Sequence, residues 1–284
     1  MILQGALYIV ATPIGHLEDI TLRARQILSA VDRIAAEDTR HSLHLLKHLG
    51  IEKPVVSLHE HNEKEKALKL LEPLQQGASL ALISDAGTPL ISDPGYHLVR
   101  LAHEQDIKVV PIPGACALIV ALCASGLATD KFVFEGFLSA KPTSRHKQLE
   151  NLIKETRTLI FFEAPHRVLA TLETMRVIFG DQRQATLARE LTKTFETIRH
   201  ATLRELWEWV SNHPMQQRGE FVILLAGASK PVQDTLSAET QRILKRLLAE
   251  LPLKQATRLA ADITGIPKGL LYEEALALKR ASEL

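Results

Sequence analysis

The stretch that decides the fold is LALISDAGTPLISDPG, residues 80–95. Its first five residues are apolar or small, a run too short for a helix, and turn-forming residues follow at once. We therefore predict a buried strand over residues 80–84. A buried strand that opens into a loop rich in Gly, Pro and Asp is typical of parallel α/β sheets, which bind ligands at the carboxyl ends of their strands. The alternative is an ordinary tight turn of an α/β protein.

The loop after this strand contains no Lys or Arg. A phosphate cradle usually supplies a cation, as in the GxxxxGK[ST] motif, which is absent here. Gly87 would let the backbone approach a ligand closely, while Pro89 and Pro94 fix φ and hold the loop in shape. A loop of carbonyl groups and one carboxylate, without a cation, suits a neutral or positively charged ligand, such as a sulfonium.

Short apolar runs on both sides of this stretch alternate with helical patterns. We expect four further strands in the first half, over residues 6–11, 34–40, 55–58 and 108–115. The apolar positions between them recur at helical spacing. This alternation predicts a parallel sheet with helices on both faces.

The chain after Gly126 has a second set of strand patterns, over residues 131–137, 158–167, 185–193, 195–203 and 219–227. The third and fourth of these are too close together for a helix, which indicates antiparallel pairing and a mixed sheet. From residue 229 a polar linker leads into helical patterns only, for which a plain three-helix cap is favoured over a helix-turn-helix. The predicted class is α/β, with α/β domains over 1–116 and 117–228 and a helical domain over 233–284.

Length and composition bound the protein class. With 284 residues, 46% hydrophobic and 24% charged, the chain fits a globular protein of two or three domains. No basic segment precedes the first apolar run, so we expect no signal peptide. The longest apolar run, residues 115–127, is shorter than the ~20 residues of a membrane span and predicts a buried helix. Cys116 and Cys123 lie seven apart on it, as core thiols of a reduced, cytoplasmic protein would.

Charge is uneven along the chain. Residues 1–130 carry 11 basic and 15 acidic side chains, whereas residues 131–218 carry 14 basic and 10 acidic. A basic second half permits a nucleic-acid partner without requiring one, because solvated helix faces explain the same difference.

Two groups of histidines raise the question of a metal site. The first is His41, His44 and His48, and the second is His59 and His61. Neither group matches HExxH or another metal-ligand spacing, so we predict no metal site. Histidines that face solvent or RNA are the preferred interpretation.

Charged clusters also follow four of the expected strands, at residues 37–40, 59–63, 163–167 and 189–193. Each alone is typical of a surface turn. Together with the 85–95 loop they predict a shared cleft between two sheets, which is the usual place for a substrate site.

Seven motifs, in this order and spacing, carry a family resemblance: VATPIGHLEDITLRA, AEDTRH, SDAGTPLISDPG, PIPGACA, FFEAPHR, ARELTKTFE and GEFVILLAG. They resemble the tetrapyrrole methylase superfamily, and within it the enzymes that modify small-subunit ribosomal RNA, and the resemblance covers nearly the whole chain. The resemblance implies two α/β domains with S-adenosyl-L-methionine between them and 2′-O-methylation of a cytidine. It also implies a helical C-terminal extension, a homodimer, and naked small-subunit ribosomal RNA or the assembled small subunit as partner.

Carried over by position, the resemblance also implies a set of cofactor contacts. These are Pro13, Gly15, Asp85, Ala86, Gly87, Thr88, Pro113, Gly114, Ala115, Phe162, Glu163, Ala188, Arg189 and Ala226. Methyl transfer needs the acceptor oxygen, the methyl carbon and sulfur in line, so positioning should supply much of the rate.

Carboxylates and histidines at the strand ends are candidates for a modest general base. The chief candidates are Asp38, Glu163 and Glu190, and His59 and His61 are further candidates. Expected RNA contacts are Arg40, His59, His61, Arg167, Arg189 and Lys193. Two alternatives stay open: methylation of a small tetrapyrrole, and a ligand-sensing protein that binds nucleic acid without catalysis. The mixed charges of PKGLLYEEALALKR weigh against a basic DNA-recognition helix.

Overall fold

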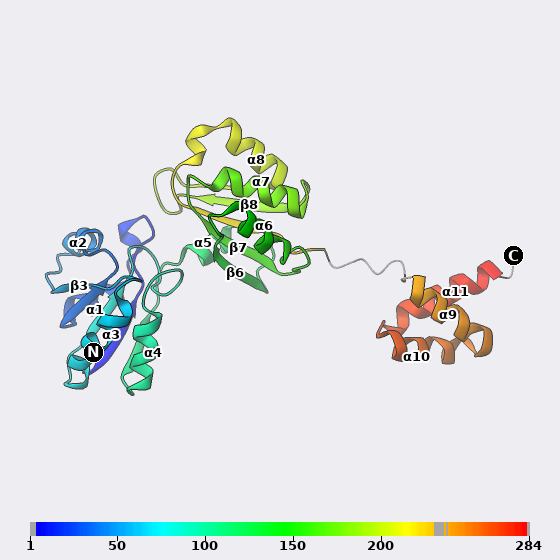
Figure 1. Ribbon diagram of the computed structural model, residues 1–284, viewed down its shortest axis with the longest axis horizontal. Helices are drawn as coiled ribbons and strands as arrows, with labels where there is room; N and C mark the ends of the chain where they lie inside the picture. The colour runs from blue at the N-terminus through cyan, green and yellow to red at the C-terminus, as the bar shows by residue number, and fades with distance from the viewer. Residues whose placement is uncertain (1–3, 230–235, 237, 283–284) are drawn as a thin grey trace. The chain divides into compact units, whose positions relative to one another are not determined.

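The computed structural model describes residues 4–229, 236 and 238–282. By their contacts, Met1–Ala228 form one compact unit and Ser229–Leu284 a second (Figure 1). The predicted division of the first unit at residue 116 stays a prediction, and the predicted start of the last domain at residue 233 lies outside the described residues.

The first unit contains two five-stranded sheets, and the first of these is wholly parallel, in the order β3-β2-β4-β1-β5. Its strands are β1 (Ala6–Val10), β2 (Arg33–Ala36), β3 (Val55–Ser57), β4 (Leu80–Ile83) and β5 (Lys108–Ile112). Every residue of β4 is buried, because helices cover both faces of the sheet. The predicted parallel sheet is therefore confirmed.

The strand predicted over residues 34–40 ends earlier, at Ala36. The reason is a helix cap: the Asp38 carboxylate accepts a hydrogen bond from the Arg40 amide and starts α2 (Thr39–His48). Arg40 thus belongs to a helix rather than a strand end.

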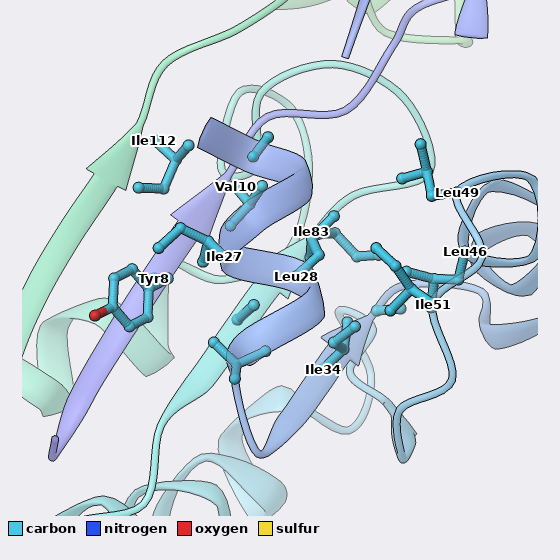
Figure 2. Close-up of a cluster of buried hydrophobic side chains, with 14 of the residues drawn as sticks. Tyr8, Val10, Ile27, Leu28, Ile34, Leu46, Leu49, Ile51, Ile83 and Ile112 are labelled. Atoms are coloured by element: carbon cyan, nitrogen blue, oxygen red, sulfur yellow. The ribbon is translucent and has the colours of Figure 1, made fainter. Parts of the chain in front are cut away.

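Two apolar layers hold the helices to this sheet. On one face, α1 (Leu22–Ala30) and α2 pack on alternate strand residues, and Figure 2 shows Ile27 and Leu28 among Val10, Ile34 and Ile83. On the other face, α3 (Glu63–Gln75) and α4 (Tyr96–Glu104) pack on the intervening residues. This alternation follows from the two-residue period of a strand.

The second sheet has the order β6-β7-β10-β8-β9 and is mixed, as predicted, because only β6 and β7 are parallel. Its strands are β6 (Phe132–Phe137), β7 (Thr158–Glu163), β8 (Gln184–Arg189), β9 (Thr197–Thr202) and β10 (Phe221–Leu225). One face carries α6 (Pro142–Glu150), α7 (Val168–Phe179) and α8 (Leu203–Asn212), of which α7 and α8 lie along the sheet in Figure 1.

The opposite face of the second sheet receives α5 (Ala117–Ala124) together with Ile14 and Leu191. The apolar run at residues 115–127 is a helix, as predicted, but its thiols are not core groups. Cys123 is exposed, and Cys116 is a half-buried N-cap residue. Of the helix residues, Leu118, Ala121 and Leu122 are buried instead.

The second unit contains α9 (Ala238–Glu250), α10 (Leu253–Thr264) and α11 (Lys268–Ser282), which share a small apolar core (Figure 1). Gly265 ends α10 in a left-handed conformation, with φ 71°. Among the described helices, none combines the length and apolar character that a bilayer crossing requires.

Candidate active site

The loop that follows β4 is fixed against the end of β1. The amide of Thr12 donates to the Gly87 carbonyl at 2.8 Å, and the amide of Gly87 donates back to the Thr12 carbonyl at 3.1 Å. Gly87 has φ 83°, which a residue with a Cβ adopts at a cost, and a Cβ there would lie 3.2 Å from Ile14 Cγ2. The Thr88 hydroxyl donates to the Ala115 carbonyl and so ties this loop to the end of β5.

This loop forms one wall of a cavity of about 370 Å³, which we call the main cavity. Its other walls come from α5 and from the second sheet. The lining residues are Ile14, Asp85, Ala86, Gly87, Thr88, Ile91, Ser92, Asp93, Cys116, Ala117, Phe137, Phe162, Glu163, Ala164, Pro165, Leu191, Glu220, Phe221 and Val222. The strand ends of two sheets therefore meet at one site.

The lining of the main cavity contains four carboxylates and no Lys, Arg or His. Beside the carboxylates lie three phenylalanines, two of which, Phe137 and Phe162, contact edge to face at 5.6 Å between ring centroids. Such a cavity offers an apolar slot for a flat ring and negative charge for a cation. The main cavity is suited to a ligand that carries both a flat ring and a positive charge.

Carboxylates crowd the ends of β2 and β4. Burial, partly offset by a hydrogen bond with Ser84 and reinforced by the charge of Asp85, raises the pKa of Asp93 to about 6. Burial and the charges of Asp93 and Asp85 likewise raise the pKa of Glu37 to about 7. The Asp85 carboxylate itself accepts a hydrogen bond from the Asp38 amide at 3.0 Å. Raised carboxyl pKa values of this kind are typical of functional sites.

A second cavity of about 330 Å³, the side cavity, shares Ile14, Asp85, Ala86 and Glu220 with the main cavity. The remaining residues of its lining are Pro13, Gly15, Leu17, His41, Ser42, His44, Leu45, Ser84 and Lys193. Unlike the main cavity, it is lined by a lysine and two histidines. The shared residues make Asp85 a common wall of two chemically different spaces.

Residues 190–193, which follow β8 of the second sheet, contact residues 15 and 16, which follow β1 of the first sheet. The amide of His16 donates to Thr192 Oγ1 at 3.1 Å, and a Cβ at Gly15 would lie 2.5 Å from Lys193 Cγ. Glycine is therefore required at position 15 for the close approach of this segment. Glu190 and Thr192 both have positive φ, at 51° and 62°.

Six of the predicted cofactor residues line the main cavity, and two more line only the side cavity. The six are Asp85, Ala86, Gly87, Thr88, Phe162 and Glu163, and the two are Pro13 and Gly15. The structure does not bring the other six to either lining: Pro113, Gly114, Ala115, Ala188, Arg189 and Ala226. Ala226 follows the far end of β10, four residues or about 13 Å along the strand from Val222.

The three predicted catalytic carboxylates are all engaged with protein groups. Both oxygens of Glu163, whose side chain is fully buried, accept hydrogen bonds, from Arg167, Thr171 and the Ala164 amide. Hydrogen bonds from the side chain and amide of Arg40 hold the pKa of Asp38 below its usual range. Both carboxylates therefore have structural partners, and their role as a base stays a prediction.

Glu190 belongs to a charge cluster with Lys193 and Glu220. Its carboxylate accepts from Lys193 Nζ at 3.0 Å and from the Glu220 amide at 2.9 Å, and Lys193 also bonds Glu220 at 2.9 Å. Burial alone would raise the pKa of Glu190, but these hydrogen bonds outweigh it and hold the pKa below its usual range. This arrangement orders the 190–193 segment, and the role of Glu190 as a base stays a prediction.

Four of the six predicted RNA contacts separate into two groups. Arg189 is buried and donates to the carbonyls of Arg218 and Phe195, and Arg167 donates to Glu163 and the Leu138 carbonyl. These guanidinium groups hold the protein together, so we withdraw the phosphate role for both. Arg40 is exposed, with 90% of its side chain accessible, and Lys193 lines the side cavity.

The remaining two predicted contacts, His59 and His61, line neither cavity. His59 Nε2 bonds the Asn62 amide at 2.8 Å. No three His, Cys, Asp or Glu side chains are placed to hold a metal ion within the part of the chain that the structure describes.

Sequence reasoning missed several cavity residues, among them Asp93, Phe137, Leu191, Glu220 and Phe221. Asp93 lies in the Gly-, Pro- and Asp-rich loop after the strand at residues 80–84, and its neighbour Pro94 was a usable signal. The other four lie at or near strand ends of the second sheet, and only the folded chain shows which of these ends meet.

Comparison with known proteins gives two family-model matches. Residues 6–207 match the model described as Tetrapyrrole (Corrin/Porphyrin) Methylases. Residues 234–279 match the RsmI C-terminal HTH domain, so the plain three-helix cap that the sequence favoured is corrected to a helix-turn-helix domain.

Curated relatives match over almost the full chain. Ribosomal RNA small subunit methyltransferase I of Pseudomonas aeruginosa is 57% identical, over 96% of this chain and 97% of its own. The protein of the same name from Haemophilus influenzae is 54% identical, over 97% of this chain and 98% of its own.

Solved structures resemble the fold. A diphthine synthase matches with a TM-score of 0.59 and 16% identity, over 78% of this chain and 90% of its own. Uroporphyrin-III C-methyl transferase from Thermus thermophilus, complexed with S-adenosylhomocysteine, matches with a TM-score of 0.56 and 20% identity, over 78% of this chain and 97% of its own. At these identities the likeness concerns the fold alone.

Proposed function

Because the chain belongs to the family of ribosomal RNA small subunit methyltransferase I, we propose that it transfers a methyl group from S-adenosyl-L-methionine to the 2′-hydroxyl of a cytidine in small-subunit ribosomal RNA. The observation that carries the proposal is the main cavity, with four carboxylates and no cation in its lining. The choice of the ribose oxygen and of cytidine rests on the motif resemblance.

The residues of the main cavity fit S-adenosylmethionine. The cofactor carries a positively charged sulfonium, which the carboxylates of Asp85 and Asp93 attract, and an adenine, for which the phenylalanine wall is an apolar slot. Gly87 lets the backbone of the loop lie close to the ligand. When bound, the cofactor supplies an electrophilic methyl group.

Asp85 is the best-placed proton acceptor for the reaction. Its carboxylate borders both cavities, and the Asp38 amide fixes the position of one oxygen. When the bound cofactor supplies its methyl group to the hydroxyl oxygen, the Asp85 carboxylate would accept the hydroxyl proton. Asp85→Asn should slow methyl transfer by about 100-fold, the usual effect of losing a general base.

The thiol of Cys116 requires a separate argument, because base methylation at C5 uses a cysteine nucleophile. The sequence suggested that neither thiol was available, but Cys116 lines the main cavity. Transfer to a hydroxyl needs no covalent bond between enzyme and base. Activity that survives Cys116→Ala would support an oxygen acceptor.

The proposal also includes the partner of the protein, its location and its oligomeric state. Naked small-subunit ribosomal RNA or the assembled small subunit is the partner, in the cytoplasm, and the helix-turn-helix unit contributes to RNA contact. The motif resemblance supports a homodimer, which sedimentation equilibrium at several protein concentrations would test.

The test is incubation of the protein with methyl-labelled cofactor and small subunits that lack the modification. Label in the small-subunit RNA would support the proposal. Label in an added tetrapyrrole instead would favour small-molecule methylation, and binding of the cofactor without any transfer would favour a ligand sensor.

A further inference from the structure

The side cavity has a composition that the proposed cofactor does not explain. It shares one wall with the main cavity, but its own part is lined by Lys193, His41 and His44. The two histidines lie on α2, three residues apart and so on one face, and both are exposed. Leu17 and Leu45 add apolar surface beside them.

One polar group of this lining has no partner. Ser42 is 2% exposed, and its hydroxyl makes no hydrogen bond within the protein. Buried hydroxyls are normally bonded, because an unsatisfied one loses its interaction with water without replacement. Since Ser42 lies in the lining of the side cavity, the missing partner is expected to be a group of a ligand.

We infer that the side cavity receives the single nucleoside that is methylated, unstacked from its RNA. This inference rests on the proposed function. The base lies against the rings of His41 and His44, and Ser42 bonds a polar group of the nucleoside. Asp85, on the wall shared with the main cavity, then faces the ribose hydroxyl.

Size and chemistry support an unstacked nucleoside rather than a helix. A cavity of about 330 Å³ is at the small end of small-molecule sites and has no room for a duplex. Enzymes that modify one nucleotide commonly take it out of the stack, and single-stranded RNA is read by stacking on aromatic rings, including histidine.

Lys193 has a positioning role at this site. Two of its three ammonium protons are directed to Glu190 and Glu220, which leaves one donor for the nucleoside or its phosphate. The ammonium therefore helps to close the cavity and contributes little net charge to RNA affinity.

The inference is tested with Ser42→Ala and with the double variant His41→Ala, His44→Ala. The matched control is His48→Ala, because His48 is an exposed histidine of the same helix outside both linings. For each protein, kcat/KM is measured on small subunits, cofactor affinity by calorimetry, and the unfolding midpoint by thermal denaturation.

We expect Ser42→Ala and the double variant to lower kcat/KM for small subunits by about tenfold or more, the usual effect of losing a stacking or polar contact to a base. Cofactor affinity should stay within about twofold. Ser42→Ala should not lower the unfolding midpoint, since its hydroxyl has no partner to lose. His48→Ala should match the unmodified protein.

A direct probe gives an independent readout. An RNA with a fluorescent cytidine analogue at the methylated position should brighten on binding, as an unstacked base does, and brighten less with the double variant. If both variants keep the wild-type kcat/KM, or if the RNA does not brighten with active protein, the inference about the side cavity is wrong while the proposed function stands. Failure of the unmodified protein to methylate small subunits would instead overturn the proposed function and, with it, this inference.

Discussion

Replacing Asp93 by asparagine should make the protein more stable at neutral pH. Burial and the charge of Asp85 raise the pKa of Asp93 to about 6 from its ordinary 3.8. A carboxyl whose pKa is raised on folding binds more protons in the folded protein, so stability falls as pH rises between these two values. The shift corresponds to about 3 kcal/mol at 1.36 kcal/mol per pKa unit, and solvent screening of this partly exposed group reduces it to about 1 kcal/mol.

We therefore expect Asp93→Asn to raise the free energy of unfolding by about 1 kcal/mol at pH 8 and by nothing measurable at pH 4. Urea denaturation at both pH values measures the difference. Asp130→Asn, a change at an exposed residue outside both cavities, serves as the control and should show no such pH dependence.

The same substitution should weaken binding of S-adenosylmethionine but not of S-adenosylhomocysteine. The two ligands differ by the sulfonium charge, and one lost carboxylate charge in a cavity of intermediate dielectric is worth about 1 kcal/mol, or about fivefold to tenfold in affinity. Calorimetry with both ligands at pH 8 measures the ratio. If the substitution weakens binding of both ligands equally, or does not weaken binding of S-adenosylmethionine, the electrostatic explanation is refuted.

Three further changes test other parts of the account. Gly87→Val should cost about 2 kcal/mol of stability, because φ 83° is strained for a β-branched residue, and should abolish cofactor binding by calorimetry while the circular dichroism spectrum stays folded; normal affinity would remove the loop from the site. Cys116→Ala should keep methyl transfer within about threefold in a labelled-cofactor assay, since hydroxyl methylation needs no thiol, and complete loss would favour base methylation. Deletion of residues 233–284 should leave cofactor affinity unchanged, because Ser229–Leu284 form a separate compact unit, and should weaken binding to small subunits in co-sedimentation; unchanged binding would limit these helices to stability or assembly.

The strands of both sheets were predictable because their signals are local. β4 and β10 are fully buried, and each reads as a short apolar run between polar or turn-forming residues. The motif resemblance to tetrapyrrole methylases is confirmed by the family-model match. The end of β2 was misplaced because the sequence was interpreted without the capping role of Asp38.

The candidate site was only partly predictable because it is assembled from distant segments. A strand-end arginine has the same sequence pattern whether it faces solvent or bonds carbonyl groups, so Arg189 was misinterpreted as an RNA contact. Heptad spacing likewise placed Cys123 in the core, although the helix turns that residue outward. Asp85 lines both cavities because of how the second sheet packs against the first, and no local sequence pattern predicts that packing.

The most direct test of the central claim is the chemical position of the transferred methyl group. Small subunits methylated with labelled cofactor are digested to nucleosides, and mass spectrometry separates the base from the sugar fragment. We predict a labelled methyl on the ribose of a single cytidine. A labelled methyl on a base, or none in small-subunit RNA from a protein that binds the cofactor, would contradict it.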